Sequence, residues 1–224
     1  MNQKVVIYRD TKNPVWIEEA NYYDKFCQEK GVEVLDVIDV GADAVDVSAP
    51  VIRGLSKKPD AFLFGTEQAQ TARIIVELNN RGWKKTDNMA CHTAVSSQTF
   101  LEICGKNVEG VYILGVTMDY DYPGETWQAF IKAFGEAHGG AKPAMYVSPY
   151  YDAPFAIKAA IEATGVTGDP AKLKEERVKI RDYICNLKDF PGVYKKFTMD
   201  PGGWARTDVD IAQIQNGVAK IVRR

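Results

Sequence analysis

The chain has 224 residues, of which 28 are Lys or Arg and 30 are Asp or Glu, so its formal net charge is -2. This balance gives no electrostatic reason to expect nucleic acid or an anionic membrane as a partner, and a small molecule or a protein is expected instead. No apolar run approaches the roughly 18 residues of a membrane-spanning helix, and Met1 leads almost directly into a predicted strand. The sequence as written therefore predicts neither a membrane helix nor a signal peptide, and by itself predicts a cytoplasmic protein.

The first half of the chain alternates predicted strands and helices. Residues 4–8 are predicted as the first strand, and residues 32–40 are rich in the β-branched residues typical of strands. Between them, Asn13 is a good N-cap and Pro14 suits the first position of a helix. The helix that follows has an apolar face made of Trp16, Ala20, Tyr23 and Cys27.

The same alternation continues as far as residue 114. Further strands are predicted at 61–64, 88–92 and 111–114, and further helices near 46–55, 67–80 and 97–104. Parallel neighbours require crossover connections, which helices between strands provide. The expected fold class is therefore α/β, a doubly wound parallel sheet with helices on both faces.

The pattern changes after Val116. Residues 126–138, 151–164 and 170–187 are predicted helices with no strand between them, and the middle one has so little polar face that we expect it to be buried on most sides. Strand patterning returns at 193–198 and 208–222, where Asn216-Gly217 is a strong signal for a two-residue hairpin. The helices need a sheet to cover, so the chain is expected to be part of a larger protein.

An enzyme is the rival class, because Cys91-His92 at a predicted strand end resembles a nucleophile and a base. Adjacent residues of a strand point to opposite faces, so these two side chains are not expected to meet. No GxSxG, GxGxxG or P-loop motif occurs, and no metal-ligand spacing is present, so neither a cofactor nor a metal is predicted. The four cysteines are expected to be buried thiols rather than disulfides: Cys27, Cys91, Cys104 and Cys185.

The order of several short motifs is informative, although no single one is specific. The first group is Asp46-Val47-Ser48, Lys58-Pro59-Asp60, Phe64-Gly65 and Glu109-Gly110-Val111. The second group is Tyr150-Tyr151-Asp152-Ala153, Arg181-Asp182-Tyr183-Ile184, Phe190-Pro191-Gly192-Val193 and Phe197-Thr198-Met199-Asp200-Pro201. In this order the motifs resemble the type I periplasmic solute-binding proteins of ABC transporters, the branch that includes the leucine/isoleucine/valine-binding proteins.

The resemblance implies two doubly wound lobes that close over a ligand. Residues 1–118 and 193–224 would form lobe two, and residues 119–192 would be the helical part of an incomplete lobe one. It also implies a periplasmic, non-enzymatic protein that binds a small organic solute, such as an amino acid or an aromatic or organic acid, and delivers it to an ABC permease. The alternatives are a ligand-sensing regulatory domain of the same fold and, less favoured, a hydrolase.

An incomplete lobe one would leave its helices uncovered, which predicts a homodimer or larger assembly through residues 126–187. The apolar residues expected on that surface are Trp127, Phe130, Phe134, Tyr151, Phe155, Ile161, Ile180, Ile184 and Leu187.

Ligands of open α/β sheets bind beyond the carboxyl ends of the strands, so the residues after each strand are the candidates. The candidate ligand-binding residues are Asp10, Asn13, Trp16, Thr66, Glu67, His92, Thr93, Thr117 and Met118. Amino-acid binders of the family it resembles typically hold the ligand ammonium with an acidic group in lobe two. The fourth strand here leads into His92 and Thr93, which are neutral, and leaves Glu67 as the nearby acid.

The candidates also have structural interpretations. Asn13 is favoured as a helix cap, and Glu67 suits the positive N-terminus of its helix. His92 is as compatible with a structural hydrogen bond as with recognition, and Asp10 is expected to form a local ion pair with Arg9. Met118 is somewhat better explained as core filler. Trp16 lies one turn into a helix that would face the cleft, where its ring could stack on a bound ring.

Overall fold

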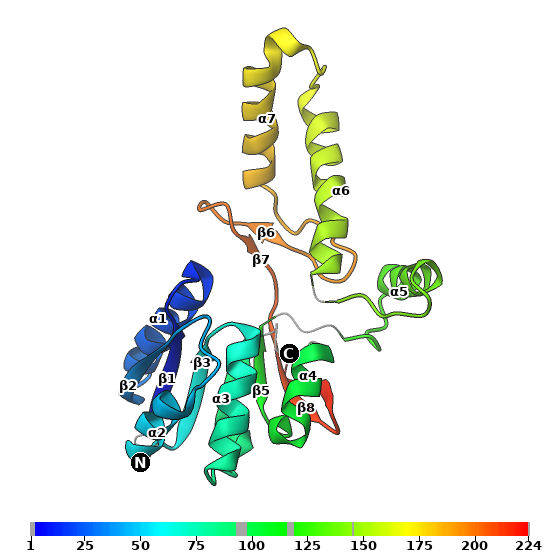
Figure 1. Ribbon diagram of the computed structural model, residues 1–224. Coiled ribbons are helices and arrows are strands. Elements are labelled where there is room, and N and C mark those ends of the chain that lie inside the picture. The colour runs from blue at the N-terminus through cyan, green and yellow to red at the C-terminus, as the bar shows by residue number, and fades with distance from the viewer. Residues whose placement is uncertain (1–2, 93–97, 116–118, 145, 224) are drawn as a thin grey trace. The chain divides into compact units, whose positions relative to one another are not determined.

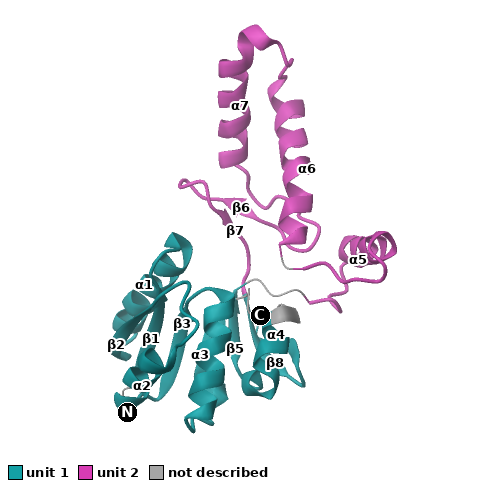
Figure 2. Cartoon of the chain, in the orientation of Figure 1, with its two compact units in different colours: residues 1–117, 210–224 teal, residues 118–209 magenta. Residues whose placement is uncertain are grey.

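The computed structural model describes residues 3–92, 98–115, 119–144 and 146–223. The chain divides into two compact units, residues 1–117 with 210–224 and residues 118–209 (Figure 2). Across the described ranges, no helix combines the length and the apolar character needed to cross a membrane.

Unit 1 is built on a mostly parallel sheet, which confirms the predicted fold class (Figure 1). In the described part of the chain its seven strands have the order β2-β1-β3-β4-β5-β8-β9, with β1 to β5 parallel and β8 and β9 antiparallel to their neighbours. The strands are β1 (Lys4–Asp10), β2 (Glu33–Val40), β3 (Ala61–Gly65), β4 (Met89–His92), β5 (Tyr112–Gly115), β8 (Asp210–Gln215) and β9 (Val218–Arg223).

Helices pack on both faces of this sheet. They are α1 (Pro14–Glu29), α2 (Ser48–Ser56), α3 (Gln68–Asn80) and α4 (Gln98–Cys104), with short 3-10 helices η1 (Thr86–Asn88) and η3 (Gly105–Val108). The main core lies between the sheet and α2, α3 and α4, and includes Tyr8, Phe62, Phe64, Ile74 and Phe100. On the other face α1 approaches β3 closely, because Gly65 has no side chain: a Cβ there would lie 2.6 Å from the Cβ of Ala20.

The predicted hairpin joins β8 and β9. Asn216 and Gly217 have φ angles of 56° and 72°, the positive values that a two-residue hairpin turn of type I′ requires. The carboxylate of Glu109 accepts a hydrogen bond from the backbone N of Asn216 at 2.7 Å, so the turn is also held from outside the hairpin.

The described part of unit 2 contains three longer helices and two very short strands. They are α5 (Glu125–Ala137), α6 (Val147–Thr164) and α7 (Leu173–Cys185), the 3-10 helix η4 (Pro170–Lys172), β6 (Thr198–Met199) and β7 (Ala205–Arg206). The helix predicted at 151–164 thus begins earlier, at Val147, and the one predicted at 170–187 begins as a 3-10 turn and ends at Cys185.

The strand predicted at 193–198 is wrong over most of its length. The backbone N of Val193 donates to Asp152 Oδ1 at 2.8 Å, and the hydroxyl of Tyr194 accepts from the backbone N of Asp119 at 3.1 Å. These bonds hold the segment as a bend within unit 2 and not as a strand. Residues 193–209 belong to unit 2, whereas the resemblance implied that 193–224 would all lie with the sheet in lobe two.

The expectation that α6 is buried on most sides is also wrong within the described residues. Ala156 and Ala160 are buried, but Phe155, Ile157 and Ile161 are 40–49% exposed. The helix packs against α7, which covers only one side of it. Trp127 and Leu187, expected on the same uncovered surface, are instead buried, and the indole N–H of Trp127 donates to the carbonyl O of Asp119 at 2.8 Å.

Candidate functional site

The carboxyl ends of β1, β3 and β4 lie side by side at one edge of the sheet of unit 1. His92 ends β4, and its ring stacks on the indole of Trp16 with centroids 4.0 Å apart and planes 24° apart. His92 Nε2 lies 2.9 Å from the carbonyl O of Thr66, directly after β3. Since a carbonyl oxygen only accepts, Nε2 carries the proton. The structure therefore brings together three of the predicted site residues.

This group is neutral and largely enclosed. His92 is 5% exposed, and burial lowers the pKa of its imidazole, an effect that the hydrogen bond to Thr66 partly opposes. Thr66 is fully buried, and its hydroxyl lies 2.8 Å from that of Thr71 on α3. At neutral pH this edge of the sheet therefore presents two uncharged aromatic rings, with the buried hydroxyl of Thr66 next to them.

Asp10 fixes the loop between β1 and α1. It is 1% exposed, and its Oδ1 accepts from the backbone N of Lys12 at 2.7 Å and of Asn13 at 2.8 Å. Its Oδ2 is enclosed and has no hydrogen-bond partner in the described part of the chain. The expected ion pair with Arg9 is wrong, because the Arg9 guanidinium bonds Asp39 Oδ1 at 2.7 Å instead.

Asn13 and Glu67 are both helix caps. The side chain of Asn13 accepts from the backbone N of Val15 at 3.0 Å, and Glu67 Oε2 accepts from the backbone N of Ala69 at 2.8 Å. The contacts of these two exposed side chains are therefore the helix-capping ones that the sequence also allowed. Thr93, Thr117 and Met118 lie outside the described residues.

Sequence reasoning missed a half-buried acid next to this site. Glu19 and Tyr23 follow Trp16 on the same face of α1, and the Tyr23 hydroxyl donates to Glu19 Oε1 at 2.6 Å. Burial raises the pKa of Glu19 to about 7, although the hydrogen bond from Tyr23 lowers it. Glu19 Oε2 and Trp16 Nε1 are enclosed without a hydrogen-bond partner among the described residues. The i, i+3, i+7 spacing from Trp16 is the signal that would have found them.

Cys91 and His92 point to opposite faces of the sheet, as predicted. Cys91 lies in the main core, where burial raises the pKa of its thiol well above the ordinary value and disfavours the nucleophilic thiolate. All four cysteines are free, with Cys185 only partly buried. Within the described ranges, no group of His, Cys, Asp and Glu side chains is arranged to hold a metal ion.

A family model described as periplasmic binding protein matches residues 3–219. No curated protein matches the chain. Among solved structures, a leucine-binding protein of Thermotoga maritima has 21% identity and a TM-score of 0.85, covering 98% of this chain and 59% of that protein.

Two further solved structures are complexes. A branched-chain amino acid transporter substrate-binding protein of Streptococcus pneumoniae, solved with isoleucine, has 17% identity and a TM-score of 0.78, covering 99% of this chain and 60% of that one. A solute-binding protein of an ABC transporter from R. palustris, solved with benzoate, has 18% identity and a TM-score of 0.78, covering 99% and 58%. The chain spans about three fifths of the length of these proteins. The predicted type I periplasmic-binding-protein fold is confirmed.

Proposed function

The chain belongs to the periplasmic binding protein family, whose members bind solutes without catalysing a reaction, and we propose that it is the solute-binding part of an ABC uptake system. Its solute would be a small organic molecule, its partner a membrane permease, and its place of action the periplasm or the outer surface of the cell. The observation that carries this proposal is the family match across residues 3–219.

We propose that unit 1 is lobe two of a two-lobed binding protein and that unit 2 contributes to lobe one. The open sheet of unit 1, with its polar and aromatic residues at one strand edge, supports the first assignment. The exposed apolar residues of α6, Phe155, Ile157 and Ile161, support the second, because further lobe-one elements in a longer protein would cover them.

The strand-edge group suggests which part of the solute lobe two contacts. Trp16 and His92 offer flat, neutral surfaces, which suit an apolar or aromatic body. The enclosed N–H of Trp16 needs an acceptor, which a solute oxygen or an ordered water would supply. Glu67 is engaged as a cap, and burial shifts Glu19 towards its neutral form, so these two acids are less available to hold an ammonium. We therefore favour an organic acid over an amino acid.

The test is calorimetric titration of the longest natural protein that contains this chain, with leucine, isoleucine and benzoate as probes. Benzoate is expected to bind more tightly than the amino acids. Replacing His92 or Trp16 with alanine should weaken its binding by about 1–3 kcal/mol, because a buried polar partner is lost. Glu18→Gln, which changes an exposed side chain on α1, is the matched control and should bind as the parent does.

A folded protein that binds none of the probes would leave the solute class open. Unchanged affinity in both the His92 and Trp16 variants would remove this edge of the sheet from the site. Tighter binding of leucine or isoleucine than of benzoate would contradict the preference for an organic acid.

A further inference from the structure

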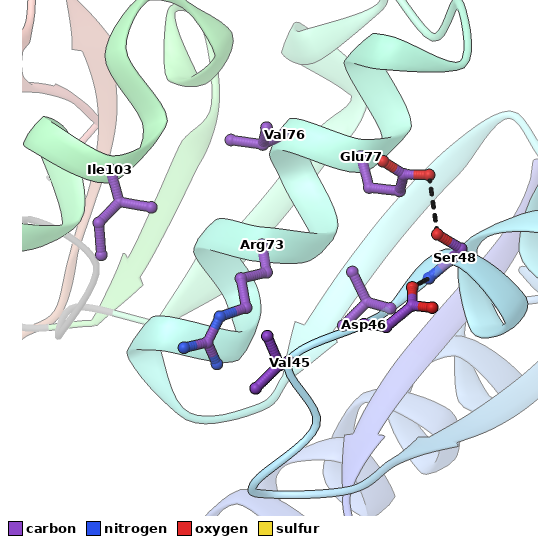
Figure 3. A pocket seen from close by; sticks show the side chains of 8 residues that line it. Val45, Asp46, Ser48, Arg73, Val76, Glu77 and Ile103 are labelled. Carbon is purple, nitrogen blue, oxygen red and sulfur yellow. Dashed lines mark hydrogen bonds between the residues drawn. The ribbon is translucent and has the colours of Figure 1, made fainter.

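The first turn of α3 holds a buried group of hydrogen bonds next to the strand-edge site. The hydroxyl of Thr71 lies 2.8 Å from the hydroxyl of Thr66 and 3.1 Å from the carbonyl O of both Thr66 and Glu67. Thr66 and Thr71 are fully buried. Further along the same helix, Arg73 and Val76 line an open hollow instead (Figure 3). The hydroxyl of Thr71 therefore acts inside the fold and not at the surface of α3.

Two donors converge on the carbonyl O of Thr66. Nε2 of His92 lies 2.9 Å from it, and Oγ1 of Thr71 lies 3.1 Å from it. A carbonyl oxygen has two lone pairs and can accept both bonds. Both hydroxyls are satisfied when Thr66 donates to Thr71 Oγ1 and Thr71 donates to the carbonyl O of Thr66. Hydrogen bonds connected in this way polarise and strengthen one another.

The turn between β3 and α3 is also held by neighbouring bonds. The backbone N of Thr71 donates to the carbonyl O of Glu67 at 2.9 Å, and Glu67 Oε2 accepts from the backbone N of Ala69 at 2.8 Å. The ring of His92 is then fixed in two ways, by the carbonyl of Thr66 at Nε2 and by the indole of Trp16 on its face. A change at Thr71 can therefore reach the stacked pair through a single carbonyl group.

We propose that Thr71 is a positioning residue for the strand-edge site: its hydroxyl orients the carbonyl of Thr66, which holds His92 in the tautomer protonated on Nε2 and keeps its ring on Trp16. In this arrangement Thr66 contributes through its carbonyl, because its hydroxyl is buried and engaged with Thr71. The role of this edge as a solute site rests on the proposed function above, whereas the tautomer of His92 can be measured without any solute.

A purely local role for Thr71 makes a different prediction. Threonine in a helix often bonds the carbonyl four residues earlier, which for Thr71 is that of Glu67. If this bond were its whole role, replacing Thr71 would change only the stability of unit 1. The contacts with the carbonyl and the hydroxyl of Thr66 go beyond that local bond. The deciding measurement must therefore report on His92 and not on stability.

The experiment is NMR of the full chain with ¹⁵N-labelled histidine at pH 8, where the imidazole of His92 is neutral because burial lowers its pKa. Protonated and unprotonated imidazole nitrogens have widely separated ¹⁵N shifts, so these shifts report the tautomer. The chain has two histidines, and the exposed His138 of unit 2 is the internal reference. In the parent, His92 should be protonated on Nε2 alone, and the Trp16 ring should shift its carbon-bound protons.

Variants of α3 separate positioning from stability. Thr71→Val removes the hydroxyl at nearly constant shape, and should move the Nε2 shift of His92 towards that of His138 and reduce the effect of the Trp16 ring. Thr71→Ser keeps a hydroxyl and should restore the parent signals. Ile75→Val trims a fully buried side chain one turn further along α3, so it is the control for lowered stability and should leave the His92 signals unchanged.

The link to binding is measured in the longest natural protein that contains this chain. Thr71→Val should weaken benzoate binding by about three- to tenfold, the equivalent of one hydrogen bond. Thr71→Ser and Ile75→Val should bind benzoate as the parent does.

A parent chain in which Nε2 of His92 is unprotonated would overturn the proposal, and this result does not depend on any variant folding. Identical His92 signals in the parent and in folded Thr71→Val would also overturn it, even if benzoate binds and the proposed function stands. Altered His92 signals with unchanged benzoate affinity would reduce Thr71 to a structural role and overturn it too. Altered His92 signals in a protein that binds no solute tested would support the link from Thr71 to His92 and contradict the proposed function.

Discussion

The half-buried acid Glu19 makes the stability of unit 1 depend on pH. Its folded-state pKa, about 7, is raised above the ordinary value of 4.5 by burial, so the folded state holds the proton more tightly than the unfolded state does. The stabilising contribution is complete below the unfolded pKa and is lost as the pH rises through about 7. At 1.36 kcal/mol per pH unit the pKa difference corresponds to about 3 kcal/mol, and the partial exposure of Glu19 reduces our expectation to about 2 kcal/mol.

Glu19→Gln tests this reasoning, because glutamine cannot ionise but can still accept the hydrogen bond from Tyr23. The free energy of unfolding of the variant, relative to the parent, should increase by about 2 kcal/mol between pH 4.5 and pH 8. At pH 4.5 the variant should be slightly less stable, by about 1 kcal/mol, since its amide N–H₂ places two donors at the enclosed position of Oε2, where protonated Glu19 places one. His92 titrates in both proteins, so its contribution cancels in the difference.

The measurement is urea unfolding followed by tryptophan fluorescence, with Trp127→Phe in both proteins. Trp127 lies in unit 2, so its removal leaves a signal dominated by Trp16 and Trp83 of unit 1, with a smaller change from the exposed Trp204. Glu18→Gln, an exposed acid one position earlier, should follow the parent at every pH. Parallel curves for Glu19→Gln and the parent from pH 4.5 to pH 8 would refute the reasoning.

Two further predictions concern packing. Gly65→Ala should destabilise unit 1 by about 1–3 kcal/mol in urea unfolding, because the new Cβ would lie 2.6 Å from the Cβ and 2.7 Å from the backbone N of Ala20. Equal stability of the variant and the parent would contradict the close approach of α1. The apolar side of α6 should cause the chain alone to form dimers or larger assemblies at tens of micromolar, and Phe155→Lys with Ile161→Lys should shift light scattering towards the monomer. A monomeric parent chain would contradict the second prediction.

The elements of unit 1 could be predicted because their signals are local. Asn13 and Pro14 specify the start of α1 through a cap and a fixed φ angle, and Asn216-Gly217 specifies the hairpin through its positive φ angles. Neither signal needs information about distant residues. The alternation of strands and helices then restricts the sheet to a parallel arrangement, so the fold followed from few assumptions.

The failures in unit 2 have a different cause. Val193, Tyr194 and Phe197 are residue types that are common in strands, but the buried Asp152, distant in sequence, accepts the hydrogen bond of the Val193 backbone N–H and keeps it out of a strand ladder. The composition of α6 indicates burial on most sides, yet α7 covers only one side of it, and Phe155, Ile157 and Ile161 are exposed. A long-range contact outweighs the local pattern at Val193, and the lack of further long-range contacts does so at α6.

The candidate site depends on the same kind of contact, which explains why the sequence predicts its members but not which of them pair. Trp16 and His92 belong to α1 and β4, with β3 between the strands β1 and β4 in the sheet. Trp16 reaches His92 because α1 lies across β3, and α1 can lie there because Ala20 faces Gly65, where any larger residue would push the helix away. The geometry of the stacked pair is thus determined by a glycine that contributes no functional group. A search for functional residues by chemical type would pass over Gly65, whereas its substitution should separate the two rings and weaken the site with them.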